Sequence, residues 1–328
     1  MKRLIISGFA VALMHSAVAA VTAVEAEQLG SSLTLFGAEA GANANGDIPA
    51  YTGGLTTAPA GYVPGSGKYV NPFADEKPLY SVSAVNMTEY SDYLTEGTKA
   101  LMEAYPTFRV DVYQTHRTVA YPQSALESTK DCAVNARLTD AQGSGFTGGF
   151  NCVLFPIPQN GMEVIWNHKT RALGKYQTVI DTEAYNVGSN GRAVLSTAVD
   201  QYYHNVFWDP DARAQFEGDR FVSMFRNHYK RPTRRAGEML LLKDPDNDQE
   251  VGRMAWSYLP GQRRVRLAPD VGHDTPNPAT SGMTTYDDNQ IGGLERFDWV
   301  LKGKREMLVP YNNYDAVFWT SKEDLLTP

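Results

Sequence analysis

The sequence predicts an α+β protein built on a curved antiparallel β-sheet, a half-barrel whose concave face is covered by helices, preceded by an extended N-terminal arm. Three observations predict this class. The second half of the chain alternates apolar and polar residues in short runs, as strands do. Turn-forming residues separate those runs. The first half holds two capped helical stretches after a segment rich in Gly, Asn and Pro.

The composition is that of a globular protein with an acidic balance. Of 328 residues, 42% are hydrophobic and 20% are charged. This length can bury a substantial core as one large β-rich domain or as two domains. The 30 basic and 37 acidic residues give a formal charge of −7, which argues against a general nucleic-acid binder.

Residues 1–19 have the three regions of a secretory signal peptide. Lys2 and Arg3 precede an apolar run over 4–14, and small residues ending at Ala19 provide a cleavage site. Cleavage there leaves 28 basic against 37 acidic residues, a formal charge of −9, although nearby alanines leave the exact bond open. No cysteine follows the apolar run to accept a lipid anchor, and no later run reaches the ~20 apolar residues of a membrane span. We therefore expect a soluble protein of the periplasm.

The chain has two cysteines, Cys132 and Cys152. In an oxidising compartment such a pair is expected to form a disulfide. The bond would stabilise the fold by roughly 3 kcal/mol, because it restricts the conformations of the unfolded chain. Two reduced, buried thiols are the alternative. The spacing does not fit a Cys-x-x-Cys redox motif.

Three regions are expected along the chain after the signal peptide. Residues 20–85 form the extended arm, because Gly, Asn and Pro are too frequent there for a regular element. A capping-box-like start at Asn86 predicts helical structure over 86–104. A second helix is predicted over 160–173, with an apolar stripe at helical spacing. Residues 86–328 are expected to form a single half-barrel domain.

Alternating runs predict a strand over 108–113 and seven further strands in the second half. These seven cover residues 176–180, 193–199, 220–229, 238–242, 250–258, 263–268 and 299–309.

The hairpin within residues 254–269 shows the sheet pattern most clearly. Because successive strand side chains point to opposite faces, Met254, Trp256 and Tyr258 share one face of the incoming strand. Pro260 and Gly261 then supply the turn, since proline presets its backbone angle and glycine tolerates a positive one.

The returning strand is amphipathic. Val265 and Leu267 lie on one face, and Arg264 and Arg266 on the other. Together with Arg263, these arginines are candidate rim or docking residues for anionic headgroups or an acidic partner. A solvated charged face is the alternative.

One face of the predicted sheet is rich in aromatic residues and methionine, which suit a pocket for a flexible apolar ligand. The alternative is an ordinary core covered by the two predicted helices. The side chains predicted to line the cavity are Phe221, Phe225, Met254, Trp256, Tyr258, Val265, Leu267, Trp299 and Met307, with Met239, Leu241 and Leu301 beside them.

The acidic run Asp244, Asp246 and Asp248 resembles a calcium loop only at first sight. An EF-hand requires glycine at its sixth position and glutamate at its twelfth, where this chain has Gln249 and Ala255. A solvated hairpin turn is the better interpretation.

Motifs of catalysis and cofactor binding are also missing from the sequence. The histidines are dispersed, and no nucleophile elbow, phosphate loop or dinucleotide fingerprint occurs. We therefore predict no catalytic residue, cofactor or metal, while a carboxylate pair brought together in space would keep a hydrolase open.

Five segments carry a resemblance to a known family: residues 35–54, 71–78, 155–168, 256–266 and 298–313. On these segments the chain resembles a bacterial secreted family of undefined function labelled outer membrane lipoprotein-sorting protein-like. The resemblance implies a half-barrel like that of the periplasmic lipoprotein carriers, with an apolar cavity and a role in handling lipids. Family members continue past residue 313 with further strands, so an ending at Pro328 would leave the sheet with an unpaired edge.

These observations lead to one expected function and two alternatives. The first is a soluble periplasmic carrier of a lipid-like or other hydrophobic molecule, without catalysis or cofactor, serving an inner-membrane transporter or an outer-membrane component. The second is an adaptor that docks to a transporter of the resistance-nodulation-division type and binds no ligand of its own. The third is a secreted hydrolase acting on glycans or lipids.

Overall fold

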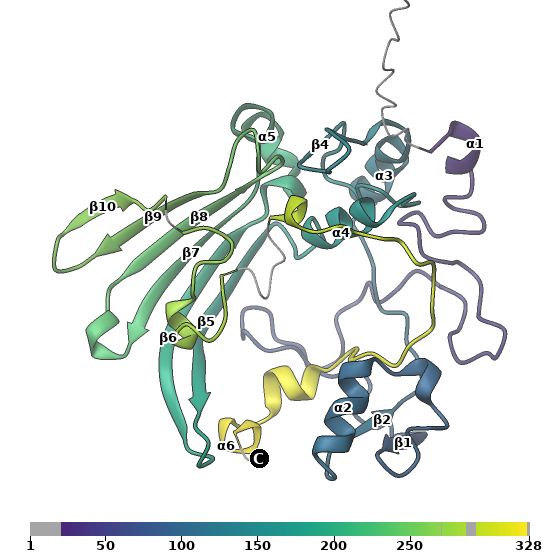
Figure 1. The fold of residues 1–328 in the computed structure, drawn as a ribbon. Helices are drawn as coiled ribbons and strands as arrows, with labels where there is room; N and C mark the ends of the chain where they lie inside the picture. Colours follow the sequence, from purple (N-terminus) through teal and green to yellow (C-terminus); the bar gives the residue numbers. More distant parts are fainter. Residues whose placement is uncertain (1–20, 270, 287–292, 327–328) are drawn as a thin grey trace, which may run out of the picture.

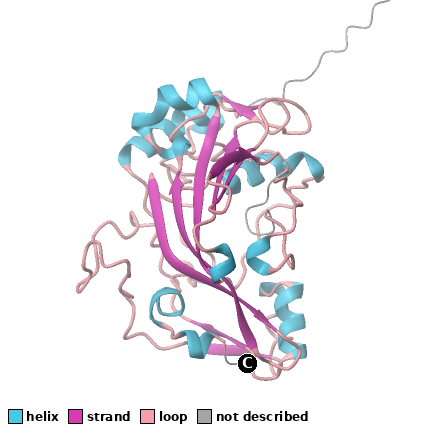
Figure 2. Cartoon of the chain, turned by 90° about the vertical axis from the view of Figure 1, so that its left-hand side faces the viewer, coloured by secondary structure: helices cyan, strands magenta, loops and turns pink. Residues whose placement is uncertain are grey.

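The computed structural model describes residues 21–269, 271–286 and 293–326 (Figure 1). The predicted signal peptide, residues 1–19, lies outside the described residues. Within them, a long antiparallel sheet meets a group of helices at one end, and a smaller lobe lies apart from the sheet (Figure 1, Figure 2).

Six strands form the sheet in the order β10-β9-β8-β7-β6-β5, so every neighbouring pair is antiparallel and adjacent in sequence. The sheet is curved and open, which confirms the predicted fold class (Figure 1). The strands are β5 Tyr176–Val187, β6 Ala193–His204, β7 Phe221–Arg231, β8 Met239–Pro245, β9 Met254–Leu259 and β10 Arg264–Leu267.

One side of the sheet, here called the covered face, holds a buried cluster. The segment that follows β10 runs back across this side, and Ala268, Val271 and Tyr286 pack on it (Figure 1). A 3-10 turn, η5 Pro278–Thr280, lies in the same segment, and the hydroxyl of Ser281 accepts a hydrogen bond from Asn186 of β5 at 2.8 Å. The buried residues of the covered face are Val199, Phe225, Tyr229, Leu240, Leu242 and Ala255.

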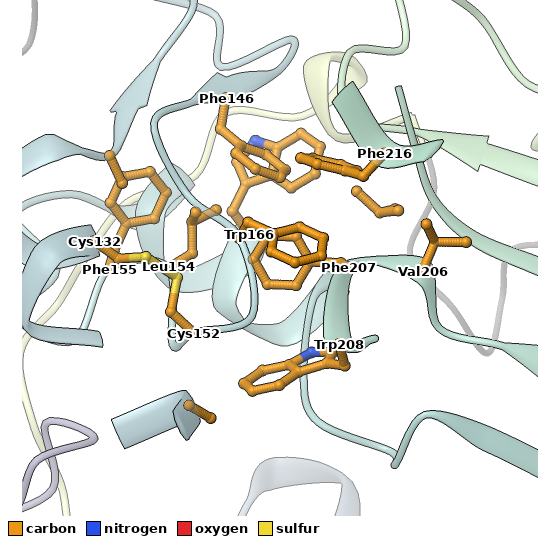
Figure 3. Packing of buried hydrophobic residues seen from close by; sticks show 14 of the residues in the cluster. Cys132, Phe146, Cys152, Leu154, Phe155, Trp166, Val206, Phe207, Trp208 and Phe216 are labelled. Atoms are coloured by element: carbon orange, nitrogen blue, oxygen red, sulfur yellow. A yellow bond between two sulfur atoms is a disulfide. The ribbon is translucent and has the colours of Figure 1, made fainter. Parts of the chain in front are cut away.

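The largest core lies where β6 leads into β7, among the helices. Phe146, Trp166, Phe207 and Phe216 pack there in edge and stacked ring contacts (Figure 3). The Trp166 indole also donates to the Gly143 carbonyl at 2.9 Å, so its polar atom is satisfied inside the core. The elements of this helical layer are α3 Gln123–Asn135, β3 Arg137–Leu138, β4 Phe146–Thr147, α4 Gly161–Lys169, η2 Val206–Trp208, η3 Pro210–Ala212 and α5 Arg213–Asp219.

A disulfide joins Cys132 of α3 to Cys152, as predicted (Figure 3). Both cysteines are buried in the helical core. The bond therefore holds α3 against the segment that leads to α4.

The acidic run that begins in the last residues of β8 is buried, which corrects the prediction of a solvated turn. Asp244 pairs with Arg253 at 2.6 Å, and Asp248 pairs with Lys169 of α4 at 2.8 Å. Burial raises the pKa of Asp246, whose carboxylate accepts from Arg220 at 3.1 Å. Through the pair of Asp248 with Lys169, this run connects the sheet to the helical layer.

A second lobe forms from β1 Tyr80–Ser83, η1 Ser91–Tyr93, α2 Glu96–Ala104 and β2 Arg109–Val112. Val82, Leu94 and Met102 make its small core. The helix predicted from Asn86 begins only at Glu96, because Thr95 is the residue that caps it through the Thr98 amide. In the arm itself, α1 Ala23–Ala26 is followed over 27–79 by turns and isolated bridges.

The strand predicted over 299–309 is wrong, because these residues form no strand and pair with none in the described part of the chain. The segment instead crosses from the helical layer to the second lobe (Figure 1). Trp299 packs against the helical core, and Leu308 packs against the second lobe and donates its amide to Tyr93 at 2.9 Å. The remaining elements are η4 Thr233–Arg235, η6 Leu294–Arg296, η7 Asp315–Trp319 and α6 Lys322–Leu325.

Candidate ligand-binding surface

The side of the sheet opposite the covered face, here called the open face, carries two rows of apolar cross-strand neighbours. Leu241 of β8 lies opposite Trp256 of β9, which lies opposite Leu267 of β10. Residues opposite each other in an antiparallel pair share a face and contact one another. We call the set the apolar patch: Met239, Leu241, Met254, Trp256, Tyr258, Val265 and Leu267.

The patch is open to solvent. Val265 is 67% exposed, Leu267 61% and Met254 39%, while the other members are half-buried. None of the buried hydrophobic clusters in the described part of the chain includes a patch residue. Large contiguous apolar surfaces are uncommon on soluble monomers and mark sites of interaction.

Cations lie beside the patch. The Lys243 ammonium is 5.5 Å from the Trp256 ring and 5.2 Å from the Phe221 ring. The Arg226 guanidinium lies 4.5 Å from the Tyr202 ring, on the neighbouring strands. Over residues 21–269, 271–286 and 293–326, neither Lys243 nor Arg226 forms an ion pair with a carboxylate. Their charges are thus available to an anionic group.

Six of the nine residues predicted to line a cavity lie on the open face, and three do not. Phe225 lies on the covered face, in the buried cluster. A bulge between Phe221 and Ser223 reverses the phase of β7, so Phe221 joins the open face while Phe225 turns away from it. Trp299 and Met307 lie in the crossing segment, outside the sheet.

The predicted rim arginines point away from the patch. Arg264 and Arg266 alternate with Val265 and Leu267 and so project on the covered-face side, at the free end of the sheet. Arg263 sits in the hairpin turn with a positive φ of 51°. The arginines therefore border the sheet edge and do not form the mouth of the apolar surface.

A polar cluster closes the end of the sheet nearest the helices. The buried carboxylate of Asp209 accepts from Lys175 at 2.7 Å, from His204 at 2.9 Å and from the Asp211 amide at 3.1 Å. Burial alone would raise the pKa of Asp209, but these hydrogen bonds outweigh it and hold the pKa below its usual range. Hydrogen bonds to Asp209 and Asp211 raise the pKa of Lys175. The cluster fixes the start of β5 to η3.

Comparison with protein families matches residues 81–328 to the family described as "Protein of unknown function (DUF1329)". The chain belongs to this family. An uncharacterised relative, protein PA3922 of Pseudomonas aeruginosa, is 39% identical over 308 residues, which are 92% of this chain and 66% of that protein. The chain thus spans just under two thirds of the length of its curated relative.

Comparison of the DUF1329 chain with solved structures finds a crystal structure described as an outer membrane lipoprotein-sorting protein domain from Vibrio parahaemolyticus. That match has a TM-score of 0.30 and 14% identity, over 42% of this chain and 50% of the other.

Two cavities of the DUF1329 chain lie outside the apolar patch. One of about 250 Å³ forms within the arm and against α3, between Leu35, Phe36, Tyr51 and Leu126. Another of about 370 Å³ lies beside Trp208 and includes Lys175 in its wall. None of the site residues predicted from the sequence lines either cavity. The cavity in the arm could not be predicted, because the arm carries no periodic pattern that would show its contacts.

The described residues of this DUF1329 member hold neither a membrane-spanning helix nor a cluster of metal ligands. No helix there has the length and apolar character needed to cross a bilayer. No group of three or more His, Cys, Asp or Glu side chains there is arranged to hold a metal ion.

Proposed function

We propose that the protein binds a lipid or a similarly hydrophobic molecule on the apolar patch and carries it in the periplasm without catalysing a reaction. The observation that carries the proposal is the contiguous, solvent-exposed set of aromatic, methionine and aliphatic side chains on β8, β9 and β10. The signal-peptide pattern and the buried disulfide support the periplasmic location.

An open sheet face can bury only one side of an acyl chain. Full burial of a methylene is worth about 0.8 kcal/mol, so half-burial of twelve methylenes contributes about 5 kcal/mol, a dissociation constant in the range of about 0.1 to 1 mM. Ordering the chain lowers this further. Useful affinity therefore requires a headgroup contact.

Lys243 and Arg226 are placed to make that contact. Both lie on the open face, and neighbouring aromatic rings hold both of them there. A carboxylate or phosphate headgroup would replace water at one of these cations while its acyl chain lies over Trp256 and Leu267. The preferred ligand class is thus an anionic amphiphile.

The test is lipid recovery from the purified protein by extraction and native mass spectrometry. Leu267→Asp places a charge in the patch and is expected to abolish co-purification of an amphiphile. Val187→Asp is the matched control, since Val187 is also exposed on the sheet, at 58%, but lies outside the patch. Absence of any apolar ligand in the wild type, or equal recovery from both variants, would overturn the proposal.

A further inference from the structure

The free backbone edge of β10 is a second exposed feature of the sheet, beside the apolar patch to which Val265 and Leu267 contribute their side chains. The sheet ends at β10, which lies at the margin of the molecule (Figure 1). All four residues of β10 are exposed. Such an edge presents unpaired backbone groups to a further strand.

The phase of the β9–β10 ladder shows which groups are unpaired. The Ala268 amide donates to the Ala255 carbonyl directly opposite, at 2.8 Å. Hydrogen-bonded and non-hydrogen-bonded pairs alternate in an antiparallel ladder, so Arg266 and Arg264 also bond towards β9. Val265 and Leu267 therefore direct their amide and carbonyl groups outwards.

The side chains of β10 define which residues an added seventh strand must carry. An added strand would place alternate residues beside Val265 and Leu267 on the open face, which favours apolar side chains there. Its intervening residues would lie beside Arg264 and Arg266. Across the described ranges no carboxylate pairs with either arginine or with Arg263, so acidic side chains are favoured at these positions.

A second copy of this chain fits the edge poorly. Antiparallel pairing of β10 with itself, centred on Val265 or on Arg266, would bring arginine beside arginine. Like charges directly opposite destabilise a strand pair. Charge complementarity thus selects a different protein.

From these features we propose that β10 is a docking edge for an extended segment of a partner protein in which apolar and acidic residues alternate. The segment adds as a seventh strand, with its backbone bonded to Val265 and Leu267 and its carboxylates paired with Arg264 and Arg266. Main-chain bonds supply affinity in this mode and alternate side chains supply specificity. The proposal stands independently of lipid binding.

The test uses two labelled, end-capped nonapeptides, one alternating valine with glutamate and one alternating valine with lysine. The acidic peptide should bind the full chain more tightly by fluorescence anisotropy, and should slow amide exchange at Val265 and Leu267. The double variant Arg264→Glu, Arg266→Glu should weaken acidic-peptide binding by about 2- to 30-fold and favour the lysine peptide.

A backbone variant separates strand addition from simple charge attraction. Val265→Pro removes an amide that does not bond to β9, so the hairpin can keep its ladder. It should weaken binding about tenfold or more, while Val265→Ala, which keeps the amide, should bind within about threefold of wild type. If Val265→Pro does not fold, the double variant Arg264→Glu, Arg266→Glu tests the charge pairing, and amide exchange at Val265 and Leu267 tests strand addition.

Three results would overturn the proposal: acidic and basic peptides binding equally, unchanged exchange at Val265 and Leu267 with saturating acidic peptide, or a homodimer of the chain that the acidic peptide disperses. The third result would assign the edge to a second copy. None of the variants at Arg264 or Arg266 changes a patch residue, so lipid recovery should persist in them and remains a separate readout.

Discussion

Removal of the Cys132–Cys152 bond tests how the helical layer is held together. Both cysteines lie in the buried helical core, where Cys152 has no exposed surface. Replacing both by alanine removes the bond without leaving a buried polar group. We expect the double variant Cys132→Ala, Cys152→Ala to fold with lower stability.

The magnitude follows from the loop that the bond closes. The cysteines are 20 residues apart. The chain-entropy relation gives about 11 cal/mol/K for such a loop, or about 3 kcal/mol at 25 °C. With a urea slope near 3 kcal/mol/M, the unfolding midpoint should fall by about 1 M.

The assay is urea unfolding followed by circular dichroism, with and without reductant. Reductant should lower the midpoint of the wild type by about the same amount and leave the double variant unchanged. The reasoning fails if the double variant unfolds at the midpoint of the oxidised wild type, or if reductant also destabilises it.

Two further predictions concern the polar cluster and the arm. Because the folded pKa of Asp209 is lowered, its carboxylate stabilises the fold above the unfolded pKa near 3.9, and that stability is lost as the pH falls through the folded pKa. The melting temperature of Asp209→Asn should therefore be lower than that of the wild type at pH 7, and this difference should shrink below about pH 4. A difference in melting temperature that does not depend on pH would contradict this. Gly37 has φ of +87° and an added Cβ would lie 1.9 Å from the Pro156 carbonyl oxygen, whereas Gly46 has φ of +79° and open space. Gly46→Ala should lower the free energy of unfolding by about 1 kcal/mol. Gly37→Ala should lower it by more and should make the arm more susceptible to trypsin. Equal losses of stability in urea unfolding would show that the arm is not packed as described.

The β9–β10 hairpin was predictable because its signals are local. Alternation assigned Trp256, Tyr258, Val265 and Leu267 to one face, and the structure places them there. The turn was recognisable from Pro260, and its strain falls on Arg263 at a positive φ. Turn chemistry and period-two alternation each depend on a few neighbouring residues.

Errors arose where the outcome depends on distant partners. The bulge that separates Phe221 from Phe225 is set by pairing with β8, and alternation within β7 does not reveal it. The run from Trp299 alternates like a strand yet pairs with no strand among the residues that the structure describes. Alternation shows that a segment can be extended and half-buried; it does not show what lies next to it.

The buried acidic run illustrates the same limit for charges. Asp244 and Asp246 lie at the end of β8, next to a turn, a context typical of solvated residues. Their partners, Arg253 and Arg220, come from different elements, and Asp248 meets Lys169 from a helix 79 positions away. Only the folded chain brings these ion pairs together.

Photolabelling with a diazirine-bearing fatty acid tests the apolar patch most directly, since it reports where on the protein an acyl chain lies. We expect labelled peptides from residues 254–267, and loss of that label in Leu267→Asp but not in Val187→Asp. Label confined to the wall of the arm cavity, around Phe36 and Leu126, or spread evenly over both sheet faces, would contradict the assignment of the open face as the binding surface.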